Sequence, residues 1–145
     1  MNASPPTEAE SDRPSPTQAG PATARVGRRV VIICRSPGRR ALLARLVGGA
    51  ETHASAVEAV LAVLRRRPQA VVLNLEDIEG RGRDLLGTLR RSRPEVPVYV
   101  IAPPEDEPLA RSLLRDGAAD YFVLPMDIYR LPRTLEKEAR AGQPV

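Results

Sequence analysis

Residues 68–77 read PQAVVLNLED, a proline followed by an unbroken apolar run and then by polar residues. An apolar run of this length is typical of a parallel β-strand that is buried on both faces. The strand would end near Asn74, with Glu76 just beyond it. Because chemistry in open parallel sheets gathers at the carboxyl ends of the strands, the residue at position 74 bears directly on function.

Four more segments are expected to be strands, of which ETHAS is short and weak, and each precedes a segment with helical spacing. The other expected strands are VVIIC (30–34), ETHAS (51–55), VPVYVIA (96–102) and DYFVL (120–124). The expected helices lie within 36–49, 55–67, 82–93, 106–117 and 128–140. Five strand–helix units with short connections predict an α/β fold, a doubly wound five-stranded parallel sheet with helices on both sides.

The second expected helix carries an apolar stripe at helical spacing, which we expect to face the core. Its members are Val57, Val60, Leu61 and Leu64.

Composition bounds the number of domains. The chain has 145 residues, 42% of them hydrophobic and only 3% aromatic, which suits one domain with an aliphatic core. Residues 1–27 are rich in Pro, Ser and Ala and nearly free of large apolar side chains, so we expect a disordered tail there. The folded domain is expected over residues 28–141, followed by a short tail at 142–145.

Several classes of function lack a signal in the sequence. Cys34 is the only cysteine and His53 the only histidine, so these two cannot build a zinc site, and a reducing compartment, the cytoplasm, is expected. No glycine-rich phosphate loop and no apolar run of about 18 residues is present. We therefore expect no cofactor, no metal and no membrane segment.

The net charge of +4 comes almost wholly from arginine. Three clusters could form a basic patch for nucleic acid, whose phosphates attract such side chains. They are Arg65, Arg66 and Arg67; Arg81 and Arg83; and Arg90, Arg91 and Arg93. Since no helix-turn-helix or aromatic platform accompanies them, nucleic-acid binding is kept as an alternative function.

Three segments, in order, resemble the receiver domain of the bacterial response-regulator family. PQAVVLNLEDIEGRGRDLL (68–86) has the receiver pattern of proline, apolar strand, acceptor position and, eight residues on, the glycine that opens a helix. VPVYVIAP (96–103) resembles the fourth strand, and GAADYFVLP (117–125) resembles Gly-Ala-x-Asp-Tyr-apolar-x-Lys-Pro. The resemblance covers residues 28–141 and implies a CheY-like, flavodoxin-like fold with strand order 2-1-3-4-5.

The family's chemical positions carry other residue types in this chain. The phosphoacceptor aspartate falls on Asn74, the two metal-binding acids on Cys34 and Arg35, the Ser/Thr on Ala102, the lysine on Leu124 and the switch aromatic on Tyr121. An amide is a poor nucleophile, and a guanidinium keeps a positive charge where a cation would sit. The sequence therefore predicts an atypical receiver that is no enzyme and signals in a two-component system without phosphotransfer.

A receiver without that chemistry would work through its surface. The resemblance implies a face for protein partners or a homodimer, made by the fourth helix, the fifth strand and the fifth helix. Its expected residues are Leu109, Arg111, Leu113, Tyr121, Ile128 and Tyr129, with Arg115, Arg130 and Leu135 around them. A receiver-like domain of a longer localisation or pilus-assembly ATPase, or of a longer regulator, is an alternative. We also hypothesise that Arg35 pairs with Glu76 in place of the missing cation.

Overall fold

The computed structural model of the protein describes residues 29–78 and 80–141, except for the side chains of Asp77 and Ala141. The tails expected at residues 1–27 and 142–145 lie outside the described residues.

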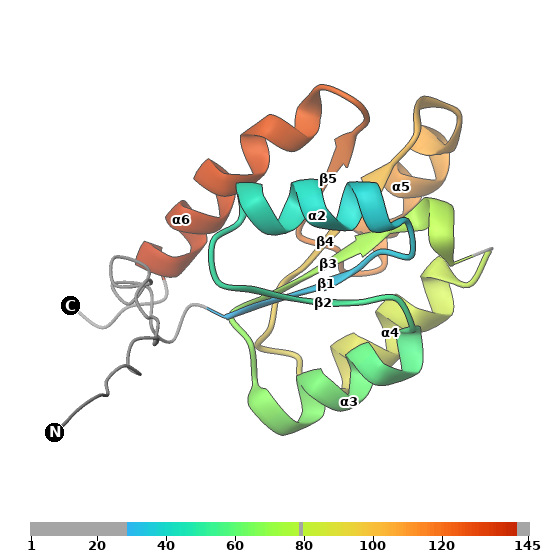
Figure 1. Ribbon diagram of the computed structural model, residues 1–145. Coiled ribbons are helices and arrows are strands. Elements are labelled where there is room, and N and C mark those ends of the chain that lie inside the picture. Colours follow the sequence, from blue (N-terminus) through green and yellow to red (C-terminus); the bar gives the residue numbers. More distant parts are fainter. Residues whose placement is uncertain (1–28, 79, 142–145) are drawn as a thin grey trace, which may run out of the picture.

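Five strands form one parallel sheet in the order β2-β1-β3-β4-β5, which confirms the predicted fold and strand order (Figure 1). Each strand leads into a helix, and short 3-10 turns (η) follow β3, β4 and β5. The elements are β1 (Val30–Ile33), α2 (Pro37–Leu46), β2 (Ala50–His53), α3 (Ala56–Arg66), β3 (Ala70–Asn74), η2 (Leu75–Asp77), α4 (Gly82–Ser92), β4 (Val98–Ala102), η3 (Pro104–Asp106), α5 (Glu107–Arg115), β5 (Asp120–Val123), η4 (Asp127–Arg130) and α6 (Leu131–Ala141).

The sheet separates two hydrophobic cores, because neighbouring residues of a strand point to opposite faces. In β1, Val31 and Ile33 pack with α3, α4 and α5, whereas Val30 and Ile32 pack with α2 and α6. Figure 1 shows α2 and α6 on one side of the sheet and α3 and α4 on the other. No helix in the described part of the chain is both long and apolar enough to cross a bilayer.

The predicted orientation of the second helix is wrong for three of the four residues of its apolar stripe, whereas Val60 packs against the core. The buried residues of α3 are Ala59, Ala62 and Val63. Much of the expected apolar stripe faces solvent instead: Val57 is 69% exposed, Leu61 44% and Leu64 38%. Alanine carries almost no side-chain bulk, so its face lies closest to the sheet and the larger apolar side chains are turned outward.

Gly82 opens α4 at a point of close contact with the chain that follows β3. A Cβ at this position would lie 2.8 Å from Leu75 Cδ2, inside the distance that real Cβ atoms adopt. Leu75 is itself buried. A side chain at the position of this glycine would therefore force the buried Leu75 to shift.

We expect Gly82→Ala to lower the free energy of unfolding by about 1–3 kcal/mol, because it overpacks the Leu75 contact. The matched control is Gly87→Ala in the same helix, where the new methyl meets only the flexible end of Arg91. There we expect no loss, or a gain of up to about 1 kcal/mol from helix propensity. Urea denaturation measures both changes, and equal effects at the two glycines would contradict the packing argument.

Tyr99 of β4 is buried, and its hydroxyl donates to Glu138 of α6 (3.3 Å). Burial, together with the Glu138 carboxylate, raises the pKa of Tyr99 above its ordinary value. The folded state then holds the phenolic proton more tightly than the unfolded state does. Unfolding releases this proton in alkali, so stability falls as pH rises beyond the unfolded pKa.

We expect the stability of the wild type to fall more steeply than that of Tyr99→Phe above about pH 10, where an unfolded tyrosine ionises. Urea denaturation at several pH values on either side of that point measures the two slopes. Parallel slopes would show that Tyr99 does not hold its proton in the folded state.

Candidate functional site

The carboxyl edge of the sheet brings three of the sequence-selected residues together. Cys34 directly follows β1, Asn74 is the last residue of β3, and Ala102 is the last residue of β4. All three side chains are completely buried. Asn74 lies beside Cys34, with its Nδ2 3.4 Å from the cysteine Sγ. Leu124 is also buried, and its backbone N–H donates to the Ala102 carbonyl (2.8 Å).

The amide of Asn74 is engaged at both ends. Its Nδ2 donates to Cys34 Sγ, and its Oδ1 accepts the backbone N–H of Glu76 at 3.3 Å, which caps η2. Cys34 Sγ in turn donates to the Ser36 carbonyl at 3.7 Å. Among the described residues, Asn74 is the only buried side chain that is polar or charged. Its bonds satisfy both polar ends of the amide, as a buried polar group requires.

Two arginines that the sequence reasoning missed lie at this edge. Arg39 Nη1 forms an ion pair with Glu76 Oε1, the position that the sequence hypothesis had assigned to Arg35. Arg40 Nη1 donates to the Cys34 carbonyl at 3.2 Å. The available signal was the helix start, because the Ser36 cap and Pro37 place positions 39 and 40 in the first turn of α2.

The residues present do not fit the divalent cation that the receiver resemblance implies. Mg²⁺ prefers carboxylate oxygens, whereas the corresponding positions carry the thiol of Cys34, the guanidinium of Arg35 and the amide of Asn74. The nearby Glu76 carboxylate is already paired with Arg39. Within residues 29–78 and 80–141, no three acidic, cysteine or histidine side chains converge as a metal site would need.

The residue at the switch-aromatic position is tied to the helix that precedes its strand. Tyr121 of β5 is partly buried, and its hydroxyl donates to Glu107 Oε2 at 2.9 Å. Arg111 Nη2 donates to the same carboxylate oxygen at 3.2 Å. The ring is thus held at the first turn of α5 by a shared acceptor.

The predicted partner face is smaller than expected. Leu113, Ile128 and Leu135 are 0%, 2% and 3% exposed and belong to the two cores, so they cannot contact a partner. Leu109 and Tyr121 are half-buried, and only Arg111 and Tyr129 of the six main residues are exposed. The cause is amphipathic helix packing, since α5 and the η4–α6 segment turn these apolar side chains inward.

Half of the eight arginines in the three clusters bind groups of the same chain. These four contact carboxylates or backbone carbonyls. Arg66 pairs with Glu51, Arg83 pairs with Asp116, Arg90 donates to the Pro94 carbonyl, and Arg93 donates to the Leu64 carbonyl.

Comparisons with known proteins place this geometry in context. No family model matches the chain. A curated relative is the probable C4-dicarboxylate response regulator DctR of Bacillus subtilis (strain 168), 26% identical over 94 residues that cover 65% of this chain and 42% of DctR. The chain thus spans less than half of that relative.

Solved structures show the same architecture over most of the chain. The N-terminal signal receiver domain of a two-component system response regulator from Bacteroides fragilis has a TM-score of 0.69 and 26% identity, and covers 77% of this chain and 95% of its own. NtrX from Brucella abortus, in complex with ADP, has a TM-score of 0.70 and 25% identity over 78% of this chain and 26% of its own. A receiver domain from Clostridium thermocellum, 16% identical with a TM-score of 0.71, supports the fold alone.

The strand order defines the protein as a member of the open, doubly wound parallel α/β class. Its candidate site lies at the carboxyl edge of the strands. Together with the relatives, they show that the described domain has a CheY-like fold and is similar to receiver domains of response regulators, which belong to two-component signalling.

We expect Asn74→Asp to lower the free energy of unfolding by about 2 kcal/mol or more at neutral pH, because it places a carboxylate in a buried position. Burial would raise the pKa of the new carboxyl, so the folded state would bind its proton more tightly. The loss should therefore grow as pH rises above about 4, the pKa of an unfolded aspartate.

Asn74→Ala is the matched control, since it removes the same bonds without adding a charge. Its loss should change little with pH. Urea denaturation at acidic and neutral pH separates the two variants. Full stability of Asn74→Asp at neutral pH would show that this edge still accommodates an ionised carboxylate.

Proposed function

We propose that this receiver domain acts by phosphorylation-independent protein–protein interaction and catalyses no phosphotransfer. The observation that carries the proposal is the buried amide of Asn74, which bonds to Cys34 Sγ and to the Glu76 N–H. A phosphoacceptor has to present an unengaged carboxylate oxygen to the incoming phosphorus. The Asn74 side chain is an amide rather than a carboxylate, and both of its ends are hydrogen-bonded within the domain, so it cannot present such an oxygen.

The neighbouring positions support the same conclusion. Without a carboxylate at Cys34 or Arg35, no cation is held to neutralise a phosphoryl group. Ala102 has no hydroxyl to hydrogen-bond a phosphoryl oxygen, and Leu124 has no ammonium to pair with one. The Tyr121 hydroxyl is bound to Glu107, which supports a ring fixed in one orientation.

A domain of this kind would transmit its signal by binding a protein partner or a second copy of itself. The exposed part of the predicted face, Arg111 and Tyr129, offers the residue types that anchor interfaces. Nucleic-acid binding is less well supported, because Arg66, Arg83 and Arg93 are bound within the domain.

The decisive experiment is an amide NMR titration of the full chain with Mg²⁺ and beryllofluoride, a mimic of the phosphoryl group. We expect no saturable shift at the amides of Arg35, Asn74 and Ala102, because the edge offers neither a carboxylate nor a cation site. Saturable shifts at these amides would mean that the site still binds the phosphoryl mimic, and the proposal would be wrong.

The control is the variant Cys34→Asp, Arg35→Asp, Asn74→Asp, which restores three carboxylates to the edge. Mg²⁺ should shift its amides at these positions, because carboxylate oxygens are the ligands that this ion prefers. If Mg²⁺ shifts the amides of the variant but not those of the wild type, the three residues, and not the solution conditions, explain why the wild type shows no shifts.

A further inference from the structure

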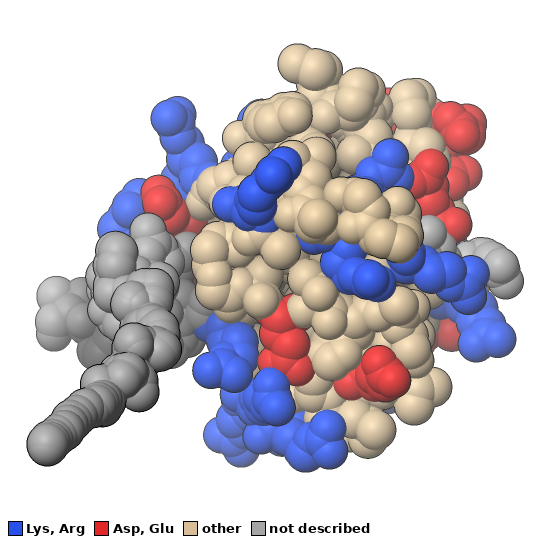
Figure 2. Space-filling view, in the orientation of Figure 1, with Lys and Arg blue, Asp and Glu red and all other residues tan. Residues whose placement is uncertain are grey.

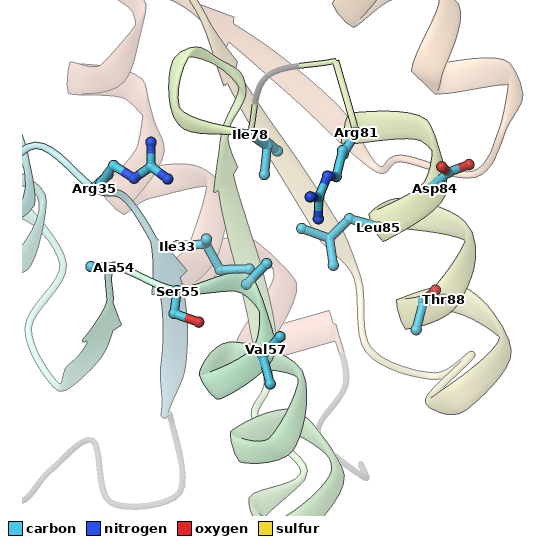
Figure 3. A pocket seen from close by; sticks show the side chains of 11 residues that line it. Ile33, Arg35, Ala54, Ser55, Val57, Ile78, Arg81, Asp84, Leu85 and Thr88 are labelled. Carbon is cyan, nitrogen blue, oxygen red and sulfur yellow. The ribbon is translucent and has the colours of Figure 1, made fainter.

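An open pocket lies between the start of α3 and the facing side of α4, beside the carboxyl end of β1. Its volume is about 570 Å³. The floor is apolar, formed by Ile33, Ile78 and Leu85. Figure 3 shows Val57 of α3 facing Leu85 of α4, with the side chain of Arg81 reaching in between Ile78 and Leu85.

The apolar surface of this pocket continues along α3. Val57, Leu61 and Leu64 recur at positions i, i+4 and i+7 and are 69%, 44% and 38% exposed. We call these three residues the α3 stripe. Val57 lines the pocket, and the backbone carbonyl of Leu64 accepts from Arg93 at the end of α4 (2.5 Å). Val57 thus joins the stripe to the pocket, and the pocket and stripe together form what we call the α3–α4 groove.

An aligned apolar stripe beside a pocket differs from scattered exposed residues, which are normal on a protein surface. The α3 stripe spans about 10 Å along the helix, or two turns. None of its residues is needed to fill the core, because Ala59, Ala62 and Val63 already do so. The exposed side chains of the stripe are thus available to a partner.

The rim of the groove carries more basic than acidic side chains. Arg81, Thr88 and Arg91 lie at helical spacing on one face of α4, with the acidic Asp84 between Arg81 and Thr88, and Arg81, Asp84 and Thr88 line the pocket. Arg65 adds a further exposed guanidinium at the end of α3. In the described part of the chain, no carboxylate pairs with Arg65, Arg81 or Arg91. Figure 2 shows basic side chains gathered around the lower end of the molecule, where α3 ends, with acidic side chains beside them and further acidic ones at the upper right, near α5.

We propose that the α3–α4 groove binds an acidic amphipathic helix of a partner protein. The apolar side chains of that helix would pack on the α3 stripe, and its carboxylates would pair with Arg81 and Arg91. The inference rests on the proposed function, because it supplies the partner chemistry for an interaction that needs no phosphorylation.

Two observations favour a helix with this charge. A groove between two helices accepts a helix that lays its apolar face down at i, i+3 and i+4 spacing, whereas an extended peptide requires an unpaired strand edge. The α3–α4 groove follows two helices rather than a strand. The arginines of the rim are complementary to an acidic partner, and such complementarity sets specificity and association rate.

The test uses the full chain and a synthetic helical peptide with leucines along one face and glutamates on the rest. A matched peptide has lysine at every glutamate position. We expect the acidic peptide to shift the amides of α3 and α4 saturably, to bind more weakly as salt is added, and to bind more tightly than the lysine peptide.

Variants of the chain test the two halves of the groove. Leu64→Ser and Arg81→Gln should each raise the Kd of the acidic peptide about fivefold or more, through lost apolar burial and lost charge pairing. Leu114→Ser on α5 is the control for Leu64→Ser, since both leucines are 38% exposed. Arg115→Gln is the control for Arg81→Gln. Both controls should leave the Kd unchanged.

Four results would overturn the inference. They are a Kd weaker than about 1 mM for the acidic peptide; equal affinity for the two peptides; shifts that map to α5 and η4 instead of the groove; and control variants that weaken binding as much as the groove variants. Sedimentation of the chain alone adds a fifth, because a dimer that Leu64→Ser dissociates would assign the groove to self-association.

The same titration, repeated with Mg²⁺ and beryllofluoride, separates this inference from the proposed function. Peptide binding in the groove together with beryllofluoride shifts at Asn74 would refute the proposed function and leave the groove assignment standing. If the Asn74 amide shows no beryllofluoride shift and the peptide does not bind, only the groove assignment is refuted.

Discussion

The side-chain amide of Asn74 hydrogen-bonds to the segments that follow β1 and β3. It donates to Cys34 at the end of β1 and accepts from the backbone of Glu76, where the chain turns away from β3. These contacts fix the start of the connection that leads through Leu75 to the close contact at Gly82. A buried polar group that lost its partners would cost about 1–3 kcal/mol, so these hydrogen bonds stabilise the carboxyl edge of the sheet.

The charges around this edge contribute little to stability. The side chains of Arg39 and Glu76 are 31% and 37% exposed, and ion pairs of this kind contribute about 0–1 kcal/mol. Arg39 and Arg40 also lie in the first turn of α2, which has no acidic residue there and whose dipole disfavours positive charge. They add basic side chains to the carboxyl edge of the sheet.

The fold could be predicted from the sequence because β1, β3 and β4 are buried throughout and give apolar runs, and a parallel sheet joined by helices has few allowed topologies. The resemblance then located the chemical positions at Cys34, Asn74 and Ala102, which do lie at one edge. The rotation of α3 could not be read in this way. Hydropathy counts large apolar side chains, whereas the distance between helix and sheet depends on small ones such as Ala59 and Ala62. The pairing of Glu76 with Arg39 was equally hidden, because the direction of a long side chain depends on the placement of its helix.

In α3, the residues that contact the sheet differ from the residues that face solvent. Ala59, Ala62 and Val63 hold the helix in place, and Val57, Leu61 and Leu64 lie on its exterior. Val57 is 69% exposed, so its substitution removes little buried surface, whereas Leu61 and Leu64 still bury more than half of theirs. Variation at Val57 therefore costs less folding free energy than variation at Ala59, Ala62 or Val63. The exterior of α3 can change most readily at the end of the helix that borders the pocket.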